Sequence, residues 1–214
     1  MICSSKSLCC LLLLLLLPLL LFSGCAALVT RYDQLPQHRQ MVPMLSGPVC
    51  RVAVLPFENG SDYPLADAIF AKVFAAQLAA AGNYLVVQEG DILKLYQQLR
   101  IMPGVMPTEE QLQIIAGRLE ADLLVTGTII EMRENPAQHA TVNPVVAVDL
   151  LLRNGASSQP LWGVYHRRQG GDYRTAMHFG AFHTVTGLCH QMAVEIINLW
   201  YKKGLPRCDV SLRS

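Results

Sequence analysis

The residues of this chain best suited to chemistry are three histidines near its C-terminal end. His178, His183 and His190 fall in a stretch whose apolar residues repeat at helical spacing. His183 and His190 are seven residues apart, which puts them on one helix face but about 10 Å apart along the axis. Two ligands of one zinc ion must each lie about 2 Å from the metal. We therefore expect a packed or surface helix here and no metal site.

A second candidate is the polar loop that follows the apolar run Arg51–Phe57 and contains Glu58, Asn59 and Asp62. Ligands bind at the carboxyl ends of the strands in open α/β sheets, so this loop is a candidate binding site. Its turn-forming residues suit a solvated loop equally well, and we prefer that interpretation. The sequence has no glycine-rich phosphate loop, no Gly-x-Ser-x-Gly nucleophile and no paired-cysteine zinc motif. We predict no catalytic residue and no cofactor.

The charge balance of the chain gives no electrostatic case for a strongly anionic partner. There are 17 basic and 16 acidic residues, and removal of residues 1–24, which hold Lys6 and no acid, leaves 16 of each. A neutral chain gives no electrostatic case for nucleic-acid binding. The small basic cluster of His166, Arg167 and Arg168 falls near the end of a predicted strand. We interpret it as a solvated sheet edge that discourages aggregation.

The N-terminal stretch has the layout of a secretory signal peptide. Lys6 precedes an apolar run from Leu8 to Phe22, which ends in the small residues Ser23 and Gly24. The run is shorter than the ~20 residues that a transmembrane helix needs. Leu-Phe-Ser-Gly-Cys25 resembles the bacterial lipobox, which implies cleavage between Gly24 and Cys25 and lipidation of Cys25. The alternative is ordinary cleavage nearby, with Cys25 an unmodified thiol.

A lipidated Cys25 would hold the protein on a membrane. Each buried methylene of an acyl chain contributes about 0.8 kcal/mol, and more than one chain makes the anchor stable. Ala26 is not the aspartate associated with inner-membrane retention, so we expect the periplasmic face of the outer membrane. Residues 25–48 contain Pro36, Pro43 and Pro48 and no sustained periodicity, which predicts a flexible tether.

Three cysteines follow Cys25 in the sequence, which is an odd number for an oxidising compartment. Cys50 precedes the first predicted strand, Cys208 follows the last predicted helix, and Cys189 lies within that helix. We predict a disulfide between Cys50 and Cys208 with Cys189 buried and free. Three unpaired thiols are the alternative, because sequence alone does not fix connectivity.

The elements that would position these residues follow an α/β pattern. Apolar runs predict strands, and apolar residues three or four apart predict helices. A capping box of Thr108 and Gln111 is expected to start one helix. The predicted strands are 51–57, 84–88, 121–132, 145–152 and 161–168, and the predicted helices are 65–81, 91–99, 108–119 and 175–201.

The order β-α-β-α-α-β-β-β-α predicts a single-domain α/β sandwich, in which helices pack on a mixed sheet. The early β-α-β unit implies a parallel pair with a right-handed crossover, and the later strands form an antiparallel meander. We assign residues 1–24 to the signal peptide, 25–48 to the lipidated cysteine and tether, 49–206 to the domain and 207–214 to a C-terminal tail.

Three segments carry a family resemblance: Val52-Ala-Val-Leu-Pro-Phe-Glu-Asn59, Leu65-Ala-Asp67 and Leu119-Glu-Ala-Asp-Leu-Leu-Val-Thr-Gly-Thr-Ile129. They resemble the fold of the TolB amino-terminal domain, the curli lipoprotein CsgG, the polysaccharide lipoprotein PelC and the penicillin-binding-protein activator lipoproteins. The resemblance implies a non-enzymatic envelope protein that is often oligomeric. The chain lacks a spare pair of the long alternating segments that would form a pore.

The expected function is therefore that of an outer-membrane-anchored periplasmic lipoprotein. It would act as an accessory or assembly subunit of an envelope machine for secretion, polysaccharide export or cell-wall synthesis. Its partners would be the membrane, other envelope proteins and copies of itself. The alternative is a periplasmic ligand- or glycan-binding module, or a hydrolase, that uses the loop from Glu58 to Asp62.

Overall fold

The structure is a computed structural model that describes residues 35–44, 47–136, 142–175 and 179–208. The predicted signal peptide, the lipobox with Cys25, His178 and residues 209–214 lie outside the described residues. None of the helices in the described ranges is both long enough and apolar enough to cross a membrane.

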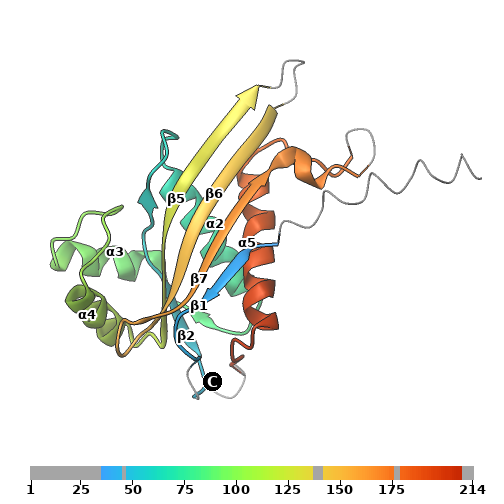
Figure 1. The fold of residues 1–214 in the computed structure, drawn as a ribbon. Helices are drawn as coiled ribbons and strands as arrows, with labels where there is room; N and C mark the ends of the chain where they lie inside the picture. The colour runs from blue at the N-terminus through green and yellow to red at the C-terminus, as the bar shows by residue number, and fades with distance from the viewer. Residues whose placement is uncertain (1–34, 45–46, 137–141, 176–178, 209–214) are drawn as a thin grey trace, which may run out of the picture. The chain divides into compact units, whose positions relative to one another are not determined.

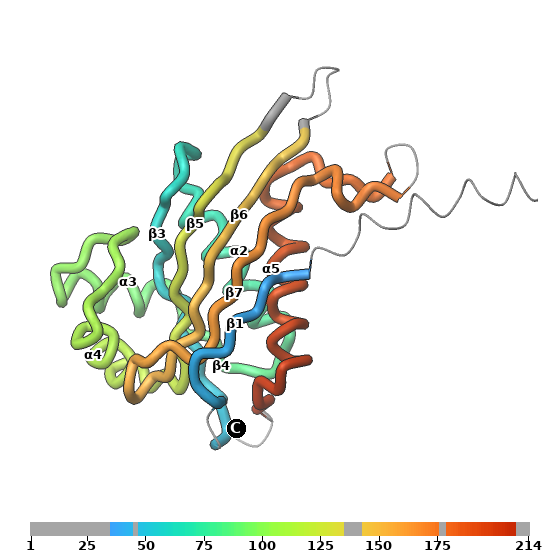
Figure 2. Tube along the Cα trace, in the orientation of Figure 1, coloured from blue at the N-terminus to red at the C-terminus, as the bar shows by residue number. Residues whose placement is uncertain are grey.

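One seven-stranded mixed sheet is the centre of the described part of the chain (Figure 1). Neighbouring strands run in the order β1-β7-β6-β5-β2-β4, and β3 also pairs with β5 (Figure 2). The strands are β1 (Gln37–Gln40), β2 (Arg51–Val54), β3 (Glu58–Asn59), β4 (Leu85–Val86), β5 (Leu123–Pro136), β6 (Val142–Asn154) and β7 (Pro160–Gln169).

The directions of the strands confirm the predicted topology. β2 is parallel to both β4 and β5, as a β-α-β unit requires. β5, β6 and β7 form an antiparallel meander. Pro56 separates β2 from β3, because proline has no N–H to donate to a ladder, and β3 then resumes the parallel pairing with β5.

Helices cover the sheet from both sides. The helices are α2 (Ala66–Ala80), α3 (Glu89–Gln98), α4 (Glu109–Leu119) and α5 (Val185–Lys202), with a short 3-10 helix η2 (Gly170–Tyr173). Alternate residues of β2 and of the position after it belong to two cores. Val52 and Val54 pack with α2 and α5, whereas Ala53 and Leu55 pack with α3 and α4. This confirms the predicted fold class, a mixed sheet packed between helices.

The two cores differ in their largest side chains. The first core, between the sheet and helices α2 and α5, contains a chain of aromatic contacts from Phe70 through Phe74 to Trp200. The second core, under α3 and α4, is built around Tyr96 and Ile115. The capping box of Thr108 and Gln111 starts α4 as predicted, with each side chain bonded to the other residue's backbone N–H.

Two segments differ from the sequence-based expectation. Gln37–Gln40, inside the predicted tether, forms the edge strand β1 and pairs with β7; its polar sequence carries no strand signal, and His38 is held by edge-on contact with Trp162. The last helix begins at Val185, not Thr175. Its boundary is set by the Thr184 cap, which accepts a hydrogen bond from the Gly187 N–H.

Candidate functional site

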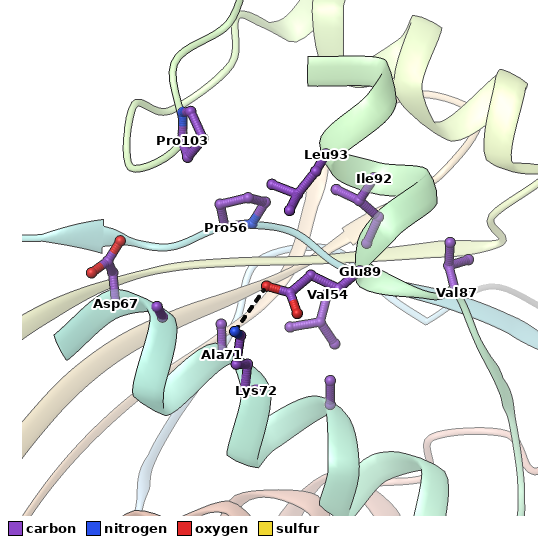
Figure 3. Close-up of a pocket in the computed structure, with 12 residues that line it drawn as sticks. Val54, Pro56, Asp67, Ala71, Lys72, Val87, Glu89, Ile92, Leu93 and Pro103 are labelled. Atoms are coloured by element: carbon purple, nitrogen blue, oxygen red, sulfur yellow. Dashed lines mark ion pairs between the residues drawn. The ribbon is translucent and has the colours of Figure 1, made fainter. Parts of the chain in front are cut away.

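A pocket of about 210 Å³ lies at the carboxyl end of β2, between helices α2 and α3 (Figure 3). Val54 and Val87 contribute from the ends of the two parallel strands. Pro56 and Pro103 line it from the loops that follow β2 and α3. This is the edge at which open α/β sheets bind ligands, and we call the cavity the α2–α3 pocket.

The α2–α3 pocket exists because α2 carries small side chains at three of the positions that face α3. Ala68, Ala71 and Ala75 are three or four residues apart and line one wall together. Ile92 and Leu93 of α3 face them (Figure 3). A larger residue at any of these alanines would fill the space, so the pocket is a direct consequence of the alanine-rich α2 sequence.

Three charged side chains line this apolar pocket. Lys72 of α2 reaches Glu89 of α3, with 3.6 Å between Nζ and Oε1, and Figure 3 shows the pair bridging the two helices. Both side chains are more than half exposed, at 63% and 57%, so the pair contributes at most about 1 kcal/mol. Asp67 lies toward one end of the pocket (Figure 3), and its carboxylate has no ion-pair or hydrogen-bond partner within the described residues.

The loop after α3 is held against this end of the pocket by Glu58. One carboxylate oxygen of Glu58 accepts a hydrogen bond from the Met106 N–H at 3.3 Å, and the other accepts from the Thr128 hydroxyl at 3.0 Å. At Gly104, where φ is +83°, a Cβ atom would lie 3.7 Å from Asp67 Oδ2. The loop therefore runs close to the first turn of α2.

The predicted binding loop lies beside the α2–α3 pocket, and none of its three polar residues lines it. Glu58 holds the neighbouring loop as described above. The Asn59 carboxamide oxygen accepts from the backbone N–H and the hydroxyl of Ser61, and Asp62 is exposed. The predicted loop and the α2–α3 pocket lie at the same edge of the sheet, but the sequence-based prediction did not include the wall from α3 or the loop containing Pro103. The alanine spacing in α2 was the available signal.

A second polar cluster is buried between β7 and α5, and it corrects the interpretation of His166 and Arg168 as part of a solvated edge, whereas Arg167 is partly exposed and pairs with Glu131 at 2.9 Å. His166 and Arg168 are 2% and 4% exposed. Glu195 accepts hydrogen bonds from Tyr173 at 2.8 Å and Gln191 at 3.2 Å, and it lies 2.6 Å from His166 and 3.4 Å from Arg168. The Glu195 carboxylate on α5 pairs with His166 and Arg168, so these basic residues near the end of β7 belong to a buried ion-pair cluster.

The pKa of Glu195 reflects two opposing effects. Burial alone would raise it, but the hydrogen bonds from His166, Tyr173 and Gln191, with the charge of His166, lower the pKa to about 2. The carboxylate is thus ionised across the whole physiological range. This cluster is satisfied by its own members, so it stabilises the fold and is not a second candidate site.

The cysteines and histidines singled out in the sequence, where the structure describes them, do not line the α2–α3 pocket. A disulfide joins Cys50 to Cys208, with their Cα atoms 4.9 Å apart, and Cys189 is free and buried. His183 precedes α5, while His190 is exposed on it. No group of three histidine, cysteine or acidic side chains is arranged to hold a metal ion among the residues with a described placement.

Comparisons with known proteins show a shared fold and little shared sequence. No protein-family model matches the chain, and no curated protein matches it. The lipoprotein GNA1162 of Neisseria meningitidis has a TM-score of 0.52 and 15% identity, over 72% of this chain and 99% of that one. A PelC dodecamer from Paraburkholderia phytofirmans has a TM-score of 0.50 and 16% identity, over 75% of this chain and 96% of that one.

The C-terminal domain of LpoB from Salmonella enterica is a looser neighbour, with a TM-score of 0.45 and 14% identity over 57% of this chain and 85% of that one. At such identities only the fold is shared. The described domain has the fold of the lipoprotein GNA1162 and of PelC, as the resemblance to PelC implied, while the likeness to TolB and CsgG stays a prediction.

Proposed function

We propose that this protein is a periplasmic lipoprotein anchored to the outer membrane through Cys25, and that it serves as an accessory or assembly subunit of an envelope machine. The observation that carries the proposal is the fold shared with the lipoprotein GNA1162 and with PelC. The lipobox-like sequence that ends at Cys25 supports it independently. The protein would act by contacts with other envelope proteins.

We propose further that the protein is not an enzyme. The acidic residue best placed for hydrolysis, Glu58, has each carboxylate oxygen bonded to a neighbouring loop or strand. Such a carboxylate is suited to holding the chain and poorly suited to activating water. A self-assembled state is part of the proposal, because PelC, which shares the fold, was solved as a dodecamer.

A second candidate is a ligand- or glycan-binding module. The α2–α3 pocket favours it, because the pocket lies at the sheet edge where ligands bind in this class of fold. Its small volume is below the ~300–1,000 Å³ of typical ligand pockets. We therefore rank this function second.

The test compares the wild-type protein, expressed with its own signal, with Cys25→Ser. We expect a wild-type chain that begins at a triacylated Cys25 and partitions into membranes, and a variant that stays in the aqueous fraction. Crosslinking and affinity capture from membranes should then recover specific envelope proteins or higher oligomers. A wild-type chain that starts elsewhere and is soluble would overturn the anchor, and a monomer that captures no envelope protein would overturn the accessory role.

A further inference from the structure

We infer that the α2–α3 pocket binds a basic side chain, lysine or arginine, from a partner polypeptide. The inference rests on the proposed function in one respect, namely that the protein acts through contacts with other polypeptides. Beyond the proposed function, the inference specifies where one such contact is made and which kind of partner side chain enters the α2–α3 pocket.

The apolar lining fits the stem of a long basic side chain. Lysine and arginine bury three or four methylene groups against apolar surface while their charged end stays near polar partners. The alanine wall of α2 and the facing Ile92 and Leu93 of α3 form the two apolar sides of the pocket (Figure 3), and we call the space between them the apolar channel. Its volume of about 210 Å³ suits one side chain better than a folded element or a large ligand.

The charges in the pocket favour a cation. Two carboxylates, Asp67 and Glu89, line it with a single ammonium group, that of Lys72. Lys72 pairs with Glu89, which leaves the Asp67 carboxylate without a counterion among the described residues. A carboxylate beside an apolar channel favours an ammonium or guanidinium group and disfavours an acidic or neutral polar one.

The Lys72–Glu89 pair controls access to the second carboxylate. The pair bridges α2 and α3 (Figure 3), and its exposure makes it weak enough for an incoming cation to compete with. Removal of the Lys72 charge should therefore strengthen binding of a basic segment, because both carboxylates would then be available. A general loss of structure would weaken binding instead, so the sign of this effect separates the two causes.

The probes are three acetylated and amidated pentapeptides, Ala-Ala-X-Ala-Ala, in which X is lysine, norleucine or glutamate. Norleucine keeps the stem of lysine and lacks its charge. Binding to the full lipidated protein in detergent is measured by saturation-transfer NMR. We expect the lysine peptide to bind at least fivefold more tightly than the norleucine peptide, the glutamate peptide not to bind, and the lysine affinity to fall as salt rises.

Four variants locate the binding. Asp67→Asn should weaken binding of the lysine peptide at least threefold, and Lys72→Met should strengthen that binding at least threefold. Ala68→Leu should abolish binding, because the larger side chain fills the channel. Glu110→Gln, an exposed change in the first turn of α4, should leave it unchanged. Thermal unfolding of each variant shows that it is folded.

Three results would overturn the inference. Equal binding of the lysine and norleucine peptides would make the pocket a purely apolar site, and equal affinity of wild type and Asp67→Asn would place the cation elsewhere. If n-butylamine alone bound as tightly as the lysine peptide, the occupant would be a small amine and not a polypeptide. Capture of envelope partners from membranes is measured separately, so failure of the peptides leaves the proposed function standing.

Discussion

His166 on β7 and Glu195 on α5 form the shortest polar contact between the sheet and the last helix in the described structure, with 2.6 Å between Nε2 and Oε2. His166 is 1% exposed and Glu195 19% exposed at the side chain. Arg168, Tyr173 and Gln191 complete the cluster around the same carboxylate. One acidic residue therefore pairs with four side chains, of which two are buried and two are partly buried.

Replacement of Glu195 by glutamine should destabilise the domain. The variant keeps the shape of the side chain but leaves Arg168, whose side chain is 5% exposed, without its counterion. Hydrogen bonds to charged groups each contribute about 1.5–3 kcal/mol, so we expect a loss of about 2–3 kcal/mol in the free energy of unfolding. Urea denaturation measures it, with Glu110→Gln as the exposed control. A loss equal to that of the control would show that the cluster is dispensable.

The difference between wild type and Glu195→Gln should depend on pH. The native pKa of Glu195, about 2, is below the ordinary value of 4.5, so the unfolded chain takes up the proton first as the pH falls. The stabilisation is fully present above about pH 4.5 and is lost as the pH falls toward 2. Unfolding curves at a series of pH values should therefore converge in this window. Curves that stay parallel down to pH 2 would contradict the assigned ionisation.

The fold was predictable because its apolar patterns are local. The runs that became β2 and β5 and the capping box of Thr108 each carry their own signal over a few residues. β1 could not be predicted in this way. It is a polar edge strand whose order depends on pairing with β7, more than 120 positions further along the chain.

The site residues were harder to predict because their roles depend on distant partners. From the sequence, His166 and Arg168 suggest a solvated basic edge, whereas in the structure α5 brings Glu195 into contact with both of them. Glu58 looks available for a ligand until the loop of Met106 folds over it. In each case the residue that makes the contact lies 27 or more positions away in the sequence, so the local pattern of residues does not reveal it.

The disulfide between Cys50 and Cys208 should contribute to stability, because it joins the segment before β2 to the end of the domain across 158 residues. Loss of a native disulfide costs about 2–5 kcal/mol. We expect the double variant Cys50→Ser/Cys208→Ser to unfold at a clearly lower temperature than wild type under oxidising conditions. Under reducing conditions the two should coincide. Equal unfolding temperatures of the variant and wild type without reductant would mean that the disulfide does not stabilise the native protein.

The free cysteine should be inert in the same protein. Burial raises the pKa of the Cys189 thiol to about 12, so it stays protonated at neutral pH, and the thiolate is the reactive form. Iodoacetamide at pH 8 should label Cys189 only after denaturation, as read by peptide mass mapping. Rapid labelling of the native protein would show that this part of α5 opens.

Gly170 and its neighbour Gly171 give a matched test of the packing around η2. A Cβ atom on Gly170 would overlap the Phe182 carbonyl oxygen, whereas on Gly171 its nearest neighbour would be Asn143 Oδ1 at 3.4 Å. The Phe182 N–H also donates a hydrogen bond to the Gly170 carbonyl at 3.0 Å. Relief of the overlap would therefore move these two residues apart and break that hydrogen bond. We expect Gly170→Ala to reduce the free energy of unfolding by about 1–3 kcal/mol, and Gly171→Ala to have little effect. Thermal denaturation of the two variants compares them directly, and equal melting temperatures would show that the loop before α5 yields without a penalty.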